Sequence, residues 1–200
     1  SNAAEADAER VASDFESTLE PVTVTGRQRG TVTFSEGAIR PIDRTLEVRT
    51  DGTVAKRIDI DGFVFESEDR RVAFHAGAII RGDQGAARMG SPPPITVDEK
   101  LRIIGIARIG ADPGSATGSD GTTAVVETDV VHDRYELGET AVTLAIETAT
   151  PNVWVRYFEG FNATAERIPG DPPTVVVAFE GDRTSYLVVH DLNAEVRAGE

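Results

Sequence analysis

The most distinctive candidate for chemistry is a repeated tetrapeptide, Val-Val-His-Asp, at residues 130–133 and again at 188–191. Imidazole and carboxylate groups are common ligands of divalent metals. If the two segments ended neighbouring strands, His132, Asp133, His190 and Asp191 could form a metal site. The alternative is that both segments are strand ends leading into turns, where His and Asp are common. Because the spacing does not require the strands to be neighbours, no metal ligand is predicted.

A second candidate consists of acidic residues. Asp59, Asp61 and Gly62 are followed by Glu66 and Glu68, an order that resembles a calcium loop. Such a loop needs an oxygen ligand at every second position, then a glycine and a distal glutamate. The apolar residues interleaved with these acids favour a pair of strands instead, so no calcium site is predicted.

The sequence has no signature of catalysis. It lacks the Gly-x-Ser-x-Gly elbow of a serine nucleophile. Gly77, Gly82 and Gly85 lie near Arg81 but without the lysine of a phosphate-binding loop. No carboxylate pair stands out as the acid and base of a glycosidase, although a hydrolase with acidic residues remains an alternative. We therefore predict a non-enzymatic protein with no catalytic residues, no cofactor-binding residues and no cofactor.

Two further motifs have structural interpretations. Trp154, Tyr157 and Phe158 follow helical spacing, which favours a place in the core over a binding surface. Asn162-Ala163-Thr164 is an N-glycosylation sequon in a predicted loop. The sequence leaves open whether Asn162 carries a glycan.

The composition indicates adaptation to concentrated salt. The chain has 34 Asp and Glu against 20 Lys and Arg, and its net charge is −14. Only Lys56 and Lys100 are lysines, which leaves 18 arginines. Such self-repulsion is screened in salt, because the Debye length falls to about 3 Å near 1 M. The charge argues against nucleic acid and anionic membrane surfaces as partners, and the absence of cysteine excludes disulfides.

Hydrophobic periodicity predicts the elements that would position these residues. Residues 4–20 read as an amphipathic helix that Pro21 ends, and 151–159 as a short helix that begins at Pro151. Most of the remainder reads as strands, with Asp-Gly hairpin turns at 51–52 and 61–62. The apolar run 101–109 is typical of a strand buried on both sides, whereas 112–121 reads as a polar loop.

These elements predict an α+β fold, in which the N-terminal helix packs on a predominantly antiparallel β body, either a sheet or a sandwich. We expect residues 4–200 to form a single domain. Ser1-Asn2-Ala3 is typical of the scar of an expression tag, so a hydrophobic segment could precede the chain in the natural protein.

Three features of the chain resemble those of a known family. They are the N-terminal helix, Gly77-Ala78-Ile79-Ile80-Arg81 with the Gly/Ala-rich segment, Met89 and prolines after it, and residues 150–159 with the terminal strands. In these features the chain resembles the pilin-like secreted proteins of halophilic archaea. The resemblance implies a membrane-anchored domain at the outer face of the cell, of minor pilin or pseudopilin type. Its partners would be other pilin-like subunits or surface proteins, and its membrane contact only the preceding helix. The alternative is a ligand- or metal-binding β domain of the cell surface.

Overall fold

A computed structural model describes residues 2–20 and 23–199 of the chain, apart from the side chain of residue 84. Pro21, the predicted helix stop, and Ser1 of the predicted tag scar lie outside this part. The helices are α1 (Asn2–Thr18) and α2 (Pro151–Glu159), with a 3₁₀ turn, η1, at Gln84–Ala86. The strands are β1 (Gly26–Ile42), β2 (Thr45–Thr50), β3 (Thr53–Asp59), β4 (Gly62–Ser67), β5 (Arg70–His75), β6 (Ala78–Arg81), β7 (Arg88–Ser91), β8 (Ile95–Val97), β9 (Leu101–Arg108), β10 (Ala116–Glu147), β11 (Thr164–Ile168), β12 (Thr174–Asp191) and β13 (Glu195–Ala198).

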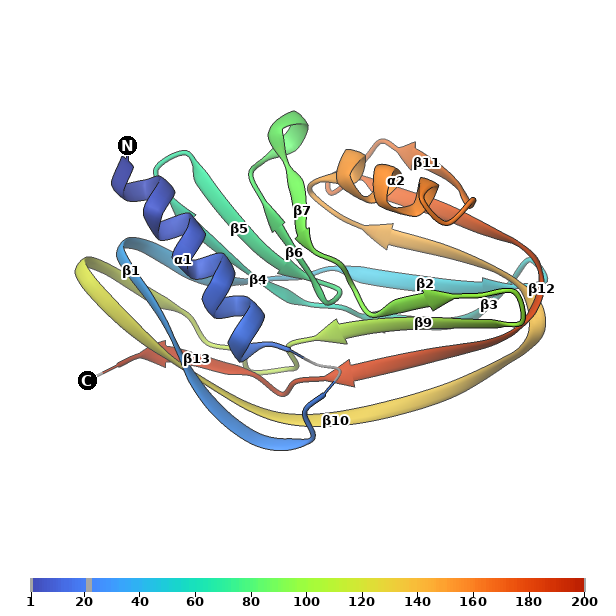
Figure 1. Cartoon of the computed structure of the whole chain (residues 1–200), viewed down its shortest axis with the longest axis horizontal. Coiled ribbons are helices and arrows are strands. Elements are labelled where there is room, and N and C mark those ends of the chain that lie inside the picture. The colour runs from blue at the N-terminus through green and yellow to red at the C-terminus, as the bar shows by residue number, and fades with distance from the viewer. Residues whose placement is uncertain (1, 21–22, 200) are drawn as a thin grey trace.

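The strands form one mixed sheet whose main path runs β7-β6-β5-β4-β1-β10-β12-β9-β8. The 32-residue strand β10 belongs to both parts of it (Figure 1). The N-terminal part of β10 pairs with β1 and β13. Together with β4–β7, these three strands form a part of the sheet that we call the α1 half. The C-terminal part of β10 pairs with β2 and β12. Together with β3, β8, β9 and β11, these three strands form the part that we call the α2 half.

The predicted α+β class was wrong, because the described chain is 62% strand and only 14% helix. Both predicted helices exist, but they cover parts of a 13-stranded sheet that makes up most of the molecule. Nor is the sheet a helix-covered sandwich, because β10 runs through both halves without a break. Most pairs are antiparallel, while β9 and β12 run parallel. The error has a physical reason. The long strands contain bulges, and the residues at these bulges resemble turns in the sequence, so the length of the strands was underestimated.

Two of the residues at these bulges are glycines. Gly138 within β10 and Gly181 within β12 both have positive φ, 92° and 84°, and both lie beside register shifts between the two strands. Glycine adopts this conformation without strain and is common at β-bulges as well as at turns. Segment 112–121, predicted as a loop, likewise contributes its second half to β10.

The hairpin predictions had different outcomes. Asp51 and Gly52 join β2 to β3 with φ of 50° and 74°, as a two-residue turn of the predicted kind requires. The turn predicted at 61–62 was wrong, because β4 does not pair with β3 but with β1 and β5. The chain crosses there from the α2 half to the α1 half. An added Cβ at Gly62 would lie 2.0 Å from the carbonyl oxygen of Phe74, so the close approach of β5 requires glycine.

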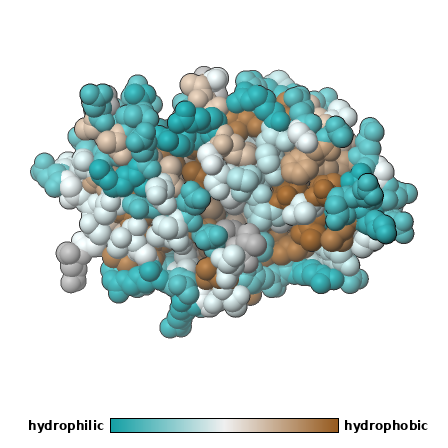
Figure 2. Space-filling model, viewed as in Figure 1, coloured by the Kyte–Doolittle hydropathy of each residue, from teal (hydrophilic) through white to brown (hydrophobic). Residues whose placement is uncertain are grey.

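The core consists of two clusters. Under α1, the apolar side chains Ala8, Val11 and Phe15 pack on one face of the α1 half. Figure 1 shows α1 lying across this part of the sheet. A larger cluster joins α2, the α2 half and the inner face of β5 and β6. Half-buried apolar residues of α2 and β8, including Val155 and Ile95, pack against it, and Figure 2 shows hydrophobic side chains gathered between these elements.

Candidate functional site

The two histidines of the repeated tetrapeptide meet. His132 of β10 lies directly opposite His190 of β12 in the antiparallel register. Their Nδ1 atoms are 2.7 Å apart and the rings are nearly perpendicular, at 82°. The metal hypothesis required the two segments to lie on neighbouring strands, and they do. The interpretation of both segments as strand ends fits Asp191, the last residue of β12, but not the segment inside β10.

The two aspartates do not join them. Successive side chains of a strand point to opposite faces, so Asp133 and Asp191 lie on the other side of the sheet from the imidazoles. There Asp191 accepts a hydrogen bond of 2.9 Å from Arg108 Nε, while Asp133 is exposed. Within residues 2–20 and 23–199 no group of three or more His, Asp or Glu side chains could hold a metal ion. The four-ligand site does not form.

Hydrogen bonds define the protonation of the histidine pair. His132 Nε2 lies 2.6 Å from the carbonyl oxygen of Val24 and 3.0 Å from Thr25 Oγ1. A carbonyl oxygen only accepts, so Nε2 carries the hydrogen, and Nδ1 of a neutral His132 is the acceptor. His190 Nδ1 then donates to it. Burial, with a smaller contribution from the charge of His132, lowers the pKa of His190 to about 4. The pair therefore ties the segment after α1 to the middle of the sheet.

The acidic candidate for calcium is also used otherwise. Asp61 Oδ1 accepts a hydrogen bond of 3.0 Å from the backbone of Arg44, and burial raises the pKa of this carboxyl group. Glu66 forms an ion pair with Arg40 at 2.5 Å. Asp59 is exposed at the end of β3. Asp59 lies in β3 and Glu66 in β4, so both lie in strands as predicted. The two strands do not form the predicted pair, because β4 pairs with β1 and β5.

The aromatic cluster around α2 is core, as predicted. Trp154 and Phe158 are fully buried, and Tyr157 is half-buried beside them. Burial raises the pKa of Tyr157. No sequence pattern indicated that His75 would join them. It is 2% exposed and lies edge-on to Trp154, with ring centroids 5.5 Å apart. Burial above all lowers the pKa of His75 to about 3, so this imidazole is neutral at ordinary pH.

Sequence reasoning also missed a fully buried arginine. Arg102 of β9 donates from Nη1 to the carbonyl of Thr140 and to Ser185 Oγ, at 2.9 and 3.2 Å. From Nη2 it donates to the carbonyls of Glu180 and Gly181, both at 3.1 Å. The three carbonyls lie where β10 and β12 lose register between Thr140 and Val142. We call this place the β10–β12 bulge.

Two carboxylates of α1 bind the backbone of β1 near the place where its register with β10 shifts. Asp7, 2% exposed, accepts from the backbone amides of Ser35 and Glu36 at 2.8 and 3.3 Å. Ser35 is the residue at which β1 loses register with β10, and we call this place the β1 bulge. Two residues before Ser35 in β1, the amide of Thr33 donates to Asp14 at 2.9 Å. The helix is therefore attached to β1 by polar contacts as well as by its apolar face.

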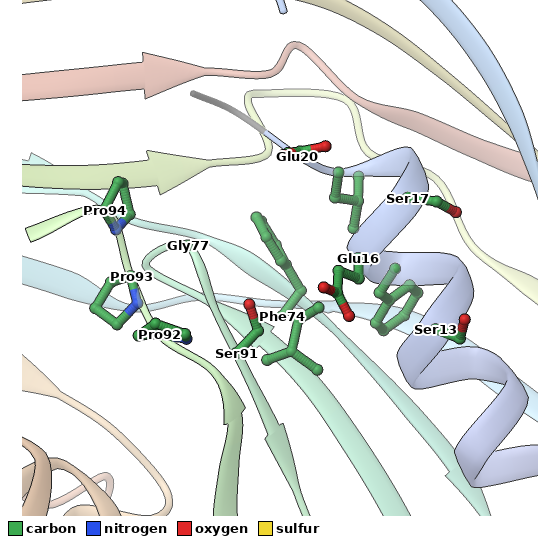
Figure 3. A pocket seen from close by; sticks show the side chains of 13 residues that line it. Ser13, Glu16, Ser17, Glu20, Phe74, Gly77, Ser91, Pro92, Pro93 and Pro94 are labelled. Carbon is green, nitrogen blue, oxygen red and sulfur yellow. The ribbon is translucent and has the colours of Figure 1, made fainter. Parts of the chain in front are cut away.

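A groove of about 670 Å³ lies between α1 and the proline segment 92–94. Figure 3 shows the three prolines on one side, Glu16 and Ser17 of α1 on the other, and Phe74 between them. Its apolar floor is already covered, since Phe74 is 1% and Ile79 4% exposed. An apolar ligand would gain little buried surface there, so the groove does not favour a ligand-binding role.

Comparison with known proteins gives a family. A family model matches residues 1–195. The chain belongs to DUF7289, a family of unknown function. Neither the comparison with curated proteins nor that with solved structures gives a match. The family description names no activity, so the pilin-like resemblance stays a prediction.

Proposed function

We propose that this DUF7289 protein is a non-enzymatic structural domain at the outer face of the cell, adapted to high salt. In this proposal a hydrophobic segment that continues α1 toward its N-terminus anchors the β body in the membrane. Pilin-like subunits or other surface proteins would be its partners. None of the helices in the described part of the chain is long and apolar enough to cross a membrane.

The observation that carries the proposal is the attachment of α1. A rigid connection to an anchor would hold the folded body in one orientation relative to the membrane. Here Asp7 and Asp14 bind backbone amides of β1, and Glu5 forms ion pairs with Arg70 and Arg81. The N-terminal end of α1 lies at the margin of the molecule, away from the core (Figure 1). A helical continuation would leave the sheet in a fixed direction.

The non-enzymatic part rests on how the buried polar groups are used. Arg102 and the histidine pair bind strand or loop backbone, and His75 is 2% exposed and packs against Trp154. Arg102 and the two paired histidines hold particular parts of the sheet, and His75 is buried, whereas a catalytic group must reach a substrate.

The anchor is tested by the gene and by cell fractionation. We expect the reading frame ahead of Ala4 to encode about 20 consecutive apolar residues. The complete protein, produced in salt-loving cells, should sediment with membranes and be cut by protease added to intact cells. Residues 4–200 alone, produced in the same cells, are the control and should stay in the soluble fraction. An upstream sequence without such a segment, or a complete protein that is soluble and protected inside the cell, would contradict the proposal.

Salt adaptation has its own test. Because screening relieves the repulsion of a charge of −14, the thermal midpoint followed by circular dichroism should rise from dilute to molar KCl. A flat or falling midpoint would show that the acidic composition is not an adaptation to salt.

A further inference from the structure

The sequon at Asn162 is the only one in the chain. The other three asparagines, Asn2, Asn152 and Asn193, are not followed by Ser or Thr at the second position. A single short motif can arise by chance. Its place in the fold therefore decides whether it can act as an acceptor.

The structure presents both functional side chains of the sequon to solvent. Asn162 and Thr164 are exposed, while Ala163 between them is only 9% exposed and points inward. Asn162 lies in the turn that ends α2, where its amide donates to the carbonyl of Glu159 at 3.2 Å. Its φ of 57° is left-handed, a conformation that asparagine tolerates better than most residues. An enzyme could reach the carboxamide and the hydroxyl together without unfolding the chain.

The sequon also leads directly into an edge of the sheet. Thr164 begins β11, which pairs with β12 and with no other strand in the described part of the chain. At the far end of β11, Ile168 is 45% exposed. An open edge with an exposed apolar residue invites pairing with another chain. A bulky polar group at the start of β11 would obstruct that pairing.

We propose that Asn162 is an N-glycan acceptor. This inference rests on the proposed extracellular location, because the donor is available only along the export route. Asn162 Nδ2 forms a bond to the anomeric carbon of an activated glycosyl phosphate, while the bond from that carbon to the phosphate oxygen breaks. The proton lost from Nδ2 leaves with the phosphate group, and nothing is oxidised or reduced. The product is an N-linked saccharide on the turn between α2 and β11.

Mass spectrometry tests the acceptor directly. Trypsin cuts after Arg156 and Arg167, so the sequon falls within one peptide, residues 157–167. We expect the complete protein from salt-loving cells to give this peptide with the added mass of at least one monosaccharide. Asn162→Gln and Thr164→Ala should lose the addition, whereas Thr164→Ser should keep it. Asn152→Gln, which changes an exposed asparagine outside a sequon, is the matched control and should also keep it.

Protease treatment of the intact cells distinguishes failure of the glycan inference from failure of the proposed extracellular location. An unmodified peptide from protein that the protease reaches at the surface overturns the inference and leaves the proposed function standing. Protein found inside the cell overturns the proposed function and the inference with it. The thermal midpoints of the variants, measured on the purified proteins, should match that of the unmodified chain within a few degrees, so that a lost glycan is not the result of misfolding.

Discussion

The β1 bulge and the β10–β12 bulge solve the same problem with opposite charges. At the β1 bulge, unpaired backbone amides point toward α1, and the carboxylate of Asp7 accepts from two of them. At the β10–β12 bulge, unpaired carbonyls converge, and the guanidinium of Arg102 donates to three of them. A bulge exposes either donors or acceptors, and a buried charge of the matching sign satisfies them. These charges therefore have structural roles that their residue types do not reveal.

Loss of Arg102 should have the largest effect, because this fully buried guanidinium donates to three backbone carbonyls at once. We expect Arg102→Met to lower the free energy of unfolding by about 3 kcal/mol, measured by denaturant titration in molar KCl. Arg27→Met is the control, since the Arg27 side chain is 91% exposed, and should change stability by less than about 0.5 kcal/mol. A loss below about 1 kcal/mol for Arg102→Met would show that the bulge does not depend on this side chain.

Asp7 should come next, because it holds two amides but lies on a helix that also packs by its apolar face. We expect Asp7→Ala to cost about 2 kcal/mol and to increase hydrogen exchange at the amides of Ser35 and Glu36. Asp7→Asn keeps one acceptor oxygen and should cost less. The control is Glu9→Ala on the exposed side of α1. Equal costs for Asp7→Ala and Glu9→Ala would contradict the attachment.

His75 and His190 should make the stability of the protein depend on pH. The pKa values of His190 and His75 in the folded protein, about 4 and about 3, lie below the ordinary value of 6.5. The unfolded chain therefore binds protons first as the pH falls. Stability should be full above pH 6.5 and decline below it, by up to about 1.4 kcal/mol per pH unit for each histidine.

Denaturant titrations between pH 7 and 5 measure this slope. His190→Asn should remove about half of it, whereas Arg102→Met should leave it unchanged. A slope that His190→Asn does not alter would mean that burial does not lower the pKa of His190 in the folded protein.

Exposed ion pairs should have the smallest effect. Arg40 and Glu66 are 56% and 44% exposed at the side chain, so Glu66→Gln should cost at most about 0.5 kcal/mol in dilute buffer. In molar KCl the cost should vanish because the pair is screened. The costs of Arg102→Met and Asp7→Ala should persist there, since both side chains are buried. Equal salt dependence for all three would remove the distinction between buried and exposed charges.

Local chemistry made part of this fold predictable. The turn at Asp51-Gly52, the helix that begins at Pro151 and the buried place of Trp154 each depend on residues close in sequence, and all three predictions are confirmed. The lengths of β10 and β12 were not predictable in this way. A glycine with positive φ, such as Gly138, occurs in bulges as well as in turns, and only the partner strand distinguishes them.

The candidate site was predictable only in part. The repeated tetrapeptide correctly drew attention to His132 and His190, yet alternation along a strand excludes Asp133 and Asp191 from the same face. Once both segments are placed in strands, the alternation of side chains alone excludes the two aspartates. The roles of Asp7 and Arg102 had no such signal, because each binds backbone that is distant in sequence.

The continuity of β10 limits how proteins of this architecture can diverge. A residue inserted into a strand turns every following side chain to the opposite face, and here the following part of β10 pairs with both β2 and β12. An insertion would disturb the core of the α2 half unless a bulge absorbed it. We therefore expect length changes among relatives of this chain to fall in the connections between strands, and within β10 only beside Gly121 or Gly138, where positive φ already interrupts the regular backbone.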